Sequence, residues 1–111
     1  MPTILPQDSN DNPIPALRLK SGGAHTISAA STSARNSTAF NADTRVVGVY
    51  ASVPVYIAFG DDTVIASASD HYFPEGVYYD FSIGGEQAAH STHMAVLRAD
   101  IDGPVYVSEK E

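Results

Sequence analysis

Short runs in which apolar and polar residues alternate restrict the fold of this chain more than any other feature of its sequence. In residues 77–83, the odd-numbered side chains are apolar or aromatic and would share one face of a β-strand, while the even-numbered ones share the other. Residues 53–59 alternate in the same way. Residues 44–51 are apolar on both faces, as in a central strand that is covered on both sides. No long stretch follows the period of a helix, so we expect an all-β fold.

Turn-forming residues separate these runs. They stand at Gly60-Asp61-Asp62, Phe73-Pro74-Glu75-Gly76, Gly84-Gly85 and Asp100-Ile101-Asp102-Gly103. The segments between them predict about seven or eight strands, near residues 24–30, 34–40, 44–51, 53–60, 63–68, 77–83, 93–99 and 104–108. Strands of this length and spacing are typical of a compact antiparallel β-sandwich or jelly roll.

Residues 1–23 have a different composition, because four of the seven prolines fall there among polar turn residues. Proline removes backbone donors, so we expect an extended N-terminal arm rather than a strand. Ser21-Gly22-Gly23 would form a flexible joint between this arm and a β-sandwich domain over residues 24–111. The arm also carries apolar residues for which a solvated tail has little use: Ile4, Leu5, Ile14, Leu17 and Leu19. We expect them to anchor the arm on a partner; the alternative is a tail that folds back onto its own domain.

The charge balance argues against two classes of partner. The chain has 6 basic and 13 acidic residues and a formal net charge of −7. Binding to nucleic acid or to an anionic membrane requires clustered lysine and arginine, so we expect neither partner. No apolar run approaches the roughly 20 residues that cross a bilayer, and we expect no signal peptide at the N-terminus. The absence of cysteine excludes disulfides and thiolate metal sites.

Candidate catalytic and metal-binding residues are few. On a helix, the spacing of His90 and His93 could bring two imidazoles to one metal, but here the pair falls in a loop that leads into a strand. The acidic turns around Asp61 and Asp102 are too short for a calcium loop and have the residues that tight turns prefer. No serine stands in a Gly-x-Ser-x-Gly elbow, and no glycine-rich phosphate loop opens a helix. We therefore expect no catalytic site, no metal and no cofactor, and do not expect an enzyme.

Three tyrosines are candidates for a binding surface. Tyr56, Tyr78 and Tyr106 fall on the face of their strands opposite the apolar one. A tyrosine on the outer face of a sheet can anchor a protein interface or stack on a sugar. It is also an ordinary strand residue, and the sequence leaves these three explanations open.

Several of these segments carry a family resemblance. The motifs are Phe59-Gly60-Asp61, Val64-Ile65-Ala66, Pro74-Glu75-Gly76 and Val105-Tyr106-Val107. In this order they resemble small bacteriophage proteins encoded among the head and tail genes, and the likeness covers residues 44–108. The resemblance implies a virion structural protein without catalytic residues, and within that group a capsid decoration, or cement, protein on the capsid surface.

The resemblance also implies partners. A decoration protein is synthesised in the cytoplasm of the bacterial host, binds the major capsid protein from outside and stabilises the shell, so self-association as a dimer or trimer would match the symmetry of the particle. The alternatives are a head- or tail-fibre component that recognises host glycans and a head–tail connector, or adaptor.

Overall fold

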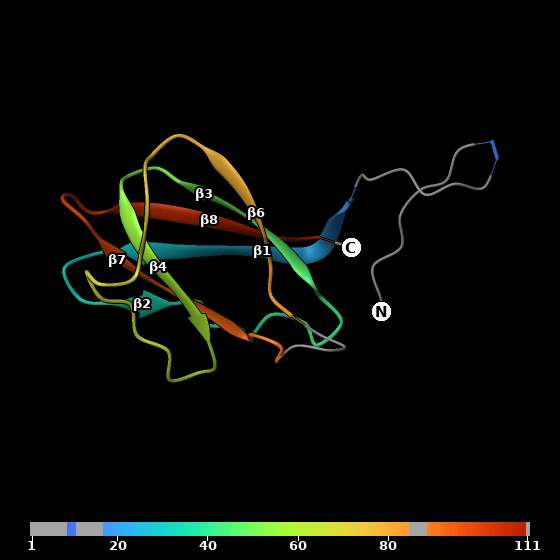
Figure 1. Cartoon of the computed structure of the whole chain (residues 1–111), viewed down its shortest axis with the longest axis horizontal. Coiled ribbons are helices and arrows are strands. Elements are labelled where there is room, and N and C mark those ends of the chain that lie inside the picture. Colours follow the sequence, from blue (N-terminus) through green and yellow to red (C-terminus); the bar gives the residue numbers. More distant parts are fainter. Residues whose placement is uncertain (1–8, 11–16, 85–88, 111) are drawn as a thin grey trace.

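The computed structural model describes residues 9–10, 17–84 and 89–110 of the chain. In this part the backbone forms eight strands and no helix. The strands are β1 (Leu19–Ala29), β2 (Ala34–Arg35), β3 (Val46–Ala51), β4 (Val55–Gly60), β5 (His71–Phe73), β6 (Tyr78–Ser82), β7 (His93–Arg98) and β8 (Gly103–Lys110). In Figure 1, β1 and β8 run side by side along the length of the domain. The residues described here include no helix with the length and hydropathy that a membrane span requires.

The strands form two antiparallel sheets of four. Their orders are β1-β8-β3-β6 and β2-β7-β4-β5. β1 pairs with β8, β2 with β7, β3 with β6 and β4 with β5. The first half of the chain, β1 to β4, therefore runs antiparallel to the second half, β5 to β8, and the loop over residues 61–70 connects the two halves. The pairs β1–β8 and β3–β6 belong to one sheet, and the pairs β2–β7 and β4–β5 belong to the other. This is the strand order of a jelly roll, and the all-β sandwich expected from the sequence is confirmed.

The loop over residues 61–70 corrects one predicted strand. A strand was expected at residues 63–68, but the fifth strand is β5, which begins at His71. Two side chains keep the loop out of the sheet. Asp61 accepts hydrogen bonds from the amide and hydroxyl of Thr63 at 2.9 and 2.6 Å, and Asp70 accepts one from the amide of Ser67 at 2.7 Å. Such local bonds compete with a ladder for the same backbone groups.

Asn36 shortens another predicted strand. A strand was expected over residues 34–40, but β2 ends at Arg35. The buried Asn36 side chain accepts a hydrogen bond from the amide of Met94 at 2.8 Å and donates one to the carbonyl of Thr38 at 2.7 Å. An amide side chain thus takes the place of backbone pairing beyond β2.

The first strand begins earlier than the sequence indicated. Residues 1–23 were expected to form the arm, with a flexible joint at Ser21-Gly22-Gly23, but β1 starts at Leu19 and runs through the glycines. Gly22 has a φ of 73°, and the pairing with β8 shifts register between Leu19 and Ala24. The glycines therefore form a β-bulge instead of a joint, because glycine adopts a positive φ without strain.

The core lies between the two sheets. Its almost completely buried side chains are Ile27, Val47, Val49, Val105 and Val107 from the first sheet and Val55, Ile57, Met94 and Val96 from the second. The expectation that residues 44–51 are covered on both faces is wrong at Tyr50, whose side chain points outward and is 36% exposed. β3 is central in its sheet, but only its inward face meets the other sheet.

The connections divide the sandwich into two ends. At the short-loop end, residues 30–33, 52–54, 74–77 and 99–102 join consecutive strands. At the long-loop end lie residues 36–45, residues 61–70, the connection from β6 to β7, the start of β1 and the end of β8. This division decides which side chains can meet on the surface.

Replacing the same residue type inside and outside the core tests this arrangement. Ile57 is 1% exposed and Ile65 in the 61–70 loop is 69% exposed. We expect Ile57→Ala to lower the free energy of unfolding by about 2–5 kcal/mol, because it removes buried methyl groups and leaves a cavity. Ile65→Ala should change it by less than about 0.5 kcal/mol. Urea denaturation followed by circular dichroism measures both; equal losses would contradict the core described here.

Candidate functional site

A row of three tyrosines crosses the outer face of the first sheet. Tyr50 on β3 lies directly opposite Tyr78 on β6 and directly opposite Tyr106 on β8. The three residues are 36%, 50% and 48% exposed, respectively. Directly opposite side chains on neighbouring strands are in contact range, so the residues form one continuous aromatic strip, here called the tyrosine row (Tyr106, Tyr50 and Tyr78).

The ring of Tyr78 is held in place by its neighbours. A Cβ atom at Gly48 would stand 2.5 Å from Cε1 of Tyr78, so the ring lies against the bare glycine backbone. The ammonium of Lys110 lies 5.0 Å from the centroid of the same ring and 2.6 Å from Oδ1 of Asp80. Glycine in a strand interior costs backbone entropy, and its use here allows the aromatic ring to approach closely. The Tyr78 ring is therefore ordered before any partner binds.

The sequence located two members of the tyrosine row and missed the third. The outward orientation predicted for Tyr78 and Tyr106 is confirmed, and the structure brings the two onto one sheet. Tyr50 was missed because its strand is apolar on both faces. The signal that could have found it is the alternation within residues 46–51, which puts Tyr50 on the face opposite Val47 and Val49.

Tyr56 belongs to a different surface. It lies on the outer face of the second sheet, opposite Tyr72 of β5 and Leu97 of β7. The rings of Tyr56 and Tyr72 meet edge to face, with centroids 5.7 Å apart. Tyr56 is half-buried and Tyr72 is 54% exposed. The two sheets thus present separate aromatic surfaces on opposite sides of the molecule.

The apolar arm residues are described only in part. Ile4, Leu5 and Ile14 lie outside the described residues. Leu17 is half-buried just before β1, and Leu19 opens β1 with 67% of its surface exposed. An exposed leucine at the start of an edge strand is compatible with contact to a partner, and it sits at the end of the sheet opposite the tyrosine row.

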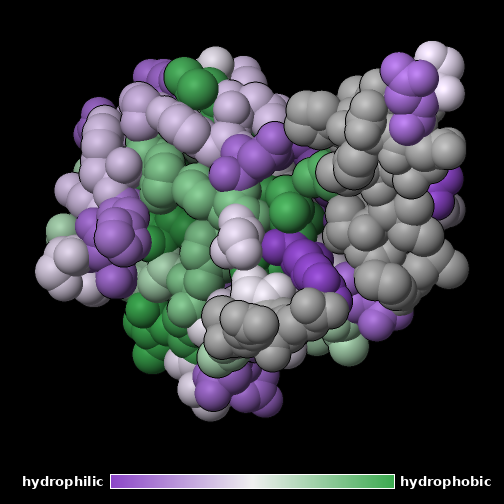
Figure 2. Space-filling model, turned by 45° about the vertical axis from the view of Figure 1, so that its right-hand side comes forward, coloured by the Kyte–Doolittle hydropathy of each residue, from purple (hydrophilic) through white to green (hydrophobic). Residues whose placement is uncertain are grey.

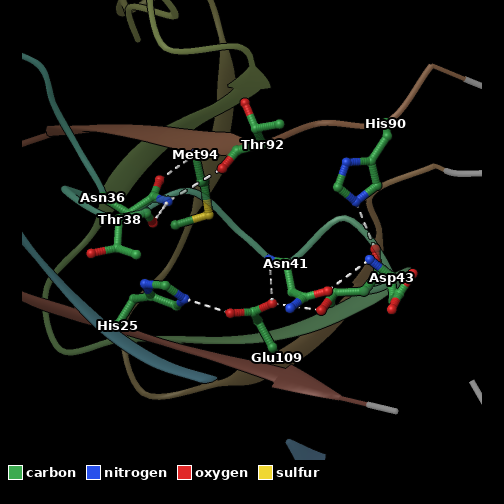
Figure 3. A network of polar contacts seen from close by, with 10 residues as sticks. His25, Asn36, Thr38, Asn41, Asp43, His90, Thr92, Met94 and Glu109 are labelled. Carbon is green, nitrogen blue, oxygen red and sulfur yellow. Dashed lines mark hydrogen bonds and ion pairs between the residues drawn. The ribbon is translucent and has the colours of Figure 1, made fainter. Parts of the chain in front are cut away.

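A buried carboxylate lies between β1, β8 and the loop before β3. Glu109 is 4% exposed and accepts hydrogen bonds from His25 Nε2 at 2.8 Å, Thr44 Oγ1 at 2.5 Å and the amide of Asn41 at 2.8 Å. Figure 3 shows its carboxylate between His25 and Asn41. Burial raises the pKa of the Glu109 carboxyl, but the three hydrogen bonds together lower it by more than burial raises it. The pKa therefore lies below its ordinary value of 4.5.

The two histidines of the H-x-x-H pair do not converge. His90 Nε2 donates to the carbonyl of Thr44 at 2.7 Å, and His93 Nδ1 is hydrogen-bonded to the hydroxyl of Thr92 at 2.9 Å. Among the described residues, no group of three or more histidine, aspartate or glutamate side chains could hold a metal ion. The Asp61 carboxylate is engaged by Thr63, whose hydroxyl and amide lower its pKa, and Asp102 pairs with Arg98 at 2.6 Å.

The described part of the chain has an apolar hollow and a polar hollow on its surface. The apolar hollow of about 270 Å³ lies between the edge strands β5 and β6 and is lined by Ile57, Phe59, His71, Phe73, Phe81 and Ser82. Its phenylalanine rings pack with centroids 5.2–5.6 Å apart. The polar hollow of about 530 Å³ near β2 is lined by Ser33, Ala34, Arg35, Asn36, Ser37, Asp62 and His93. In this polar hollow, Arg35 donates to the carbonyl of Val64 at 3.1 Å, so its guanidinium ties down the 61–70 loop.

The exposed apolar surface is gathered and not scattered. Figure 2 shows apolar side chains collected over the middle of one face, with polar side chains around them; tyrosine is weakly hydrophilic on the scale of this figure, so these green side chains are not the tyrosine row. Five of the exposed large hydrophobic residues lie in the tyrosine row or in the loops of the short-loop end: Tyr50, Val77, Tyr78, Ile101 and Tyr106. Gathered apolar side chains with a polar border are typical of a surface that binds another molecule.

Comparison of the chain with protein-family models, with curated proteins and with solved structures gives no match.

The Glu109 site generates a prediction about acid stability. Because the carboxyl has a lower pKa in the folded chain than in the unfolded one, it adds stability above pH 4.5, and this contribution is lost as the pH falls through the lower folded value. We expect Glu109→Gln to lower the free energy of unfolding by about 1–3 kcal/mol at neutral pH. The variant should also lose less of its remaining stability on acidification than the wild type.

Urea denaturation at a series of pH values measures both effects. Glu75→Gln, which changes an exposed glutamate in the 74–77 turn, is the matched control and should follow the wild type. Asp61, whose pKa is also lowered, is present in all three proteins, so the comparison isolates Glu109. An unchanged pH dependence in Glu109→Gln would show that its hydrogen bonds do not stabilise the fold.

Proposed function

We propose that this chain is a structural protein of a bacteriophage particle, a decoration protein that binds the outer surface of the major capsid protein shell and stabilises it. The resemblance of residues 44–108 to small phage head and tail proteins supports the virion part of the proposal. The jelly roll supports it at the level of fold, because viral capsid domains use this architecture. Lectin domains use it as well, so the particular role has to be argued from the surface.

The observation that carries the proposal is the tyrosine row. Tyrosine is enriched in protein interfaces because a large apolar ring and a hydroxyl are ordered at low entropic cost. Tyr50, Tyr78 and Tyr106 stand in register on one sheet, are between 36% and 50% exposed and include a ring fixed by Gly48 and Lys110. These features suit the tyrosine row to binding another protein.

A fibre component that recognises glycans is the second candidate. Exposed tyrosines on a jelly roll would also suit sugar stacking. Stacking needs a free ring face, however, and the Tyr78 ring already holds the Lys110 ammonium 5.0 Å from its centroid and lies against Gly48. These contacts disfavour a sugar at Tyr78, whereas the enrichment of tyrosine in protein interfaces applies to all three residues of the row.

The arm supplies a second contact in this proposal. Three half-exposed tyrosines offer on the order of 300 Å² of aromatic surface, against roughly 800 Å² per partner in a stable protein interface. The apolar residues Ile4, Leu5, Ile14, Leu17 and Leu19 would add apolar surface, and of these Leu17 and Leu19 lie toward the other end of the sheet. The proposal includes self-association as a dimer or trimer, which would match the symmetry of the shell. Several linked copies would bind the shell more tightly than one arm and one tyrosine row alone.

The number of copies in the particle tests the decoration role. Quantitative mass spectrometry of purified particles of the phage that encodes the chain, with the major capsid protein as internal standard, measures it. We expect on the order of hundreds of copies, as symmetric coverage of a shell requires. About a dozen copies would point to a connector or fibre component, and absence from the particle would overturn the virion role.

Truncation tests the arm. The cut should follow residue 16, because removing residues up to Gly22 would also remove the start of β1. We expect the truncated domain to keep its unfolding midpoint and to bind particles stripped of the protein at least tenfold more weakly, as loss of one of two linked contacts implies. Unchanged affinity would show that the arm is not an anchor.

A further inference from the structure

We infer that the tyrosine row docks onto a basic, arginine-bearing patch of its partner protein. This inference rests on the proposed function, because it names the chemistry of the surface that the decoration protein would bind. It stands on the distribution of charge around the tyrosine row and on a cation already bound to one of its rings.

Two exposed carboxylates, Glu75 and Asp100, lie in loops of the short-loop end, and Asp80 lies on the other side of the tyrosine row, toward the long-loop end. Glu75 lies in the turn that precedes Tyr78, and the amide of Gly76 donates to the carbonyl of Ala51 at 2.9 Å, which holds this turn beside the end of β3. Asp80 follows Tyr78 on the same face of β6, and Asp100 lies in the loop that leads into β8. All three acidic residues are exposed.

The basic residues of this sheet lie toward the other end. They are Arg18 and Lys20 near the start of β1, Arg45 just before β3 and Lys110 at the end of β8. The Lys110 ammonium, however, reaches the tyrosine row and neutralises Asp80, and Arg98 neutralises Asp102, so the excess negative charge at the short-loop end of the row comes from Glu75 and Asp100. A partner with a basic surface would be attracted there, whereas an anionic one would be repelled.

Lys110 shows how a cation binds here. Its ammonium lies over the Tyr78 ring, 5.0 Å from the centroid, and is paired with Asp80 at 2.6 Å. A tyrosine face with a carboxylate beside it thus holds a positive charge within the folded chain. Tyr50 and Tyr106 continue the same strip, with Glu75 and Asp100 as carboxylates at the same end. Arginine suits such sites better than lysine, because its planar guanidinium stacks on a ring while still donating to carboxylates.

A peptide titration of the full chain tests the inference. The probe is a short peptide of alternating arginine and glycine, with a glutamate–glycine peptide as the control, followed by NMR amide shifts. We expect the arginine peptide to shift signals around Tyr50, Tyr78 and Tyr106, with binding that weakens as salt is raised. The glutamate peptide should not bind.

Matched variants distinguish binding of the arginine peptide to the tyrosine row from its nonspecific attraction to an acidic protein. Tyr50→Ser should weaken the arginine peptide about two- to fivefold, and Tyr72→Ser on the opposite sheet should leave it unchanged. Glu75→Gln combined with Asp100→Asn should weaken binding about two- to fivefold, while the same charge change at Asp61 and Asp62 should not.

Shifts that map elsewhere, no binding, or equal effects of Tyr50→Ser and Tyr72→Ser would overturn the inference. The mapping on the wild-type chain decides the matter even if a variant fails to fold. If the arginine peptide does not bind but the copy number in particles is high, the inference is wrong and the decoration role stands. If the peptide binds but the copy number is low, the decoration role is wrong and the inference stands as a property of the surface.

Discussion

The register in which β3 pairs with β8 and β6 determines the rest of this structure. Val47 and Val49 face the core only because they align with the inward residues of both neighbours. A slip of one residue would turn these valines to solvent and Tyr50 into the core. The same register that builds the core therefore also builds the tyrosine row on the other face.

Two further features depend on that register. Gly48 stands one position along the outer face from Tyr50, where the Tyr78 ring can lie against it. Glu109 stands on the inward side of β8, where His25 from β1 and Thr44 from the loop before β3 reach its carboxylate. The Glu109 bonds stabilise the long-loop end, and the exposed aromatic residues gather toward the short-loop end. The molecule thus separates a hydrogen-bonded end, where the arm enters, from an end with a surface suited to contact.

The sequence was informative where the structure depends on neighbours in the chain. Alternation over residues 77–83 predicted β6 and the outward position of Tyr78, and the run over residues 53–60 predicted β4. The sequence was less informative where a residue far away in the chain determines the local structure. The Asn36 amide ends β2 by bonding to Met94, and the glycines at 22 and 23 form a bulge because β8 pairs across them. Thr63 and Ser67 were expected in a strand, yet aspartate side chains hold their backbone in a loop. Tyr50 and the Glu109 pair depend on strands that only the fold brings together.

Chemical labelling of tyrosine tests the central claim that the tyrosine row is the contact surface. Nitration with tetranitromethane, read by mass spectrometry of peptides, would compare the free chain with the chain bound to particles. Tyr50, Tyr78, Tyr106 and Tyr72 are all exposed in the free chain and should react. On particles, the three residues of the tyrosine row should be protected while Tyr72 still reacts. Protection of Tyr72 with continued reaction of Tyr50, Tyr78 and Tyr106 would contradict the claim and place the contact on the other sheet.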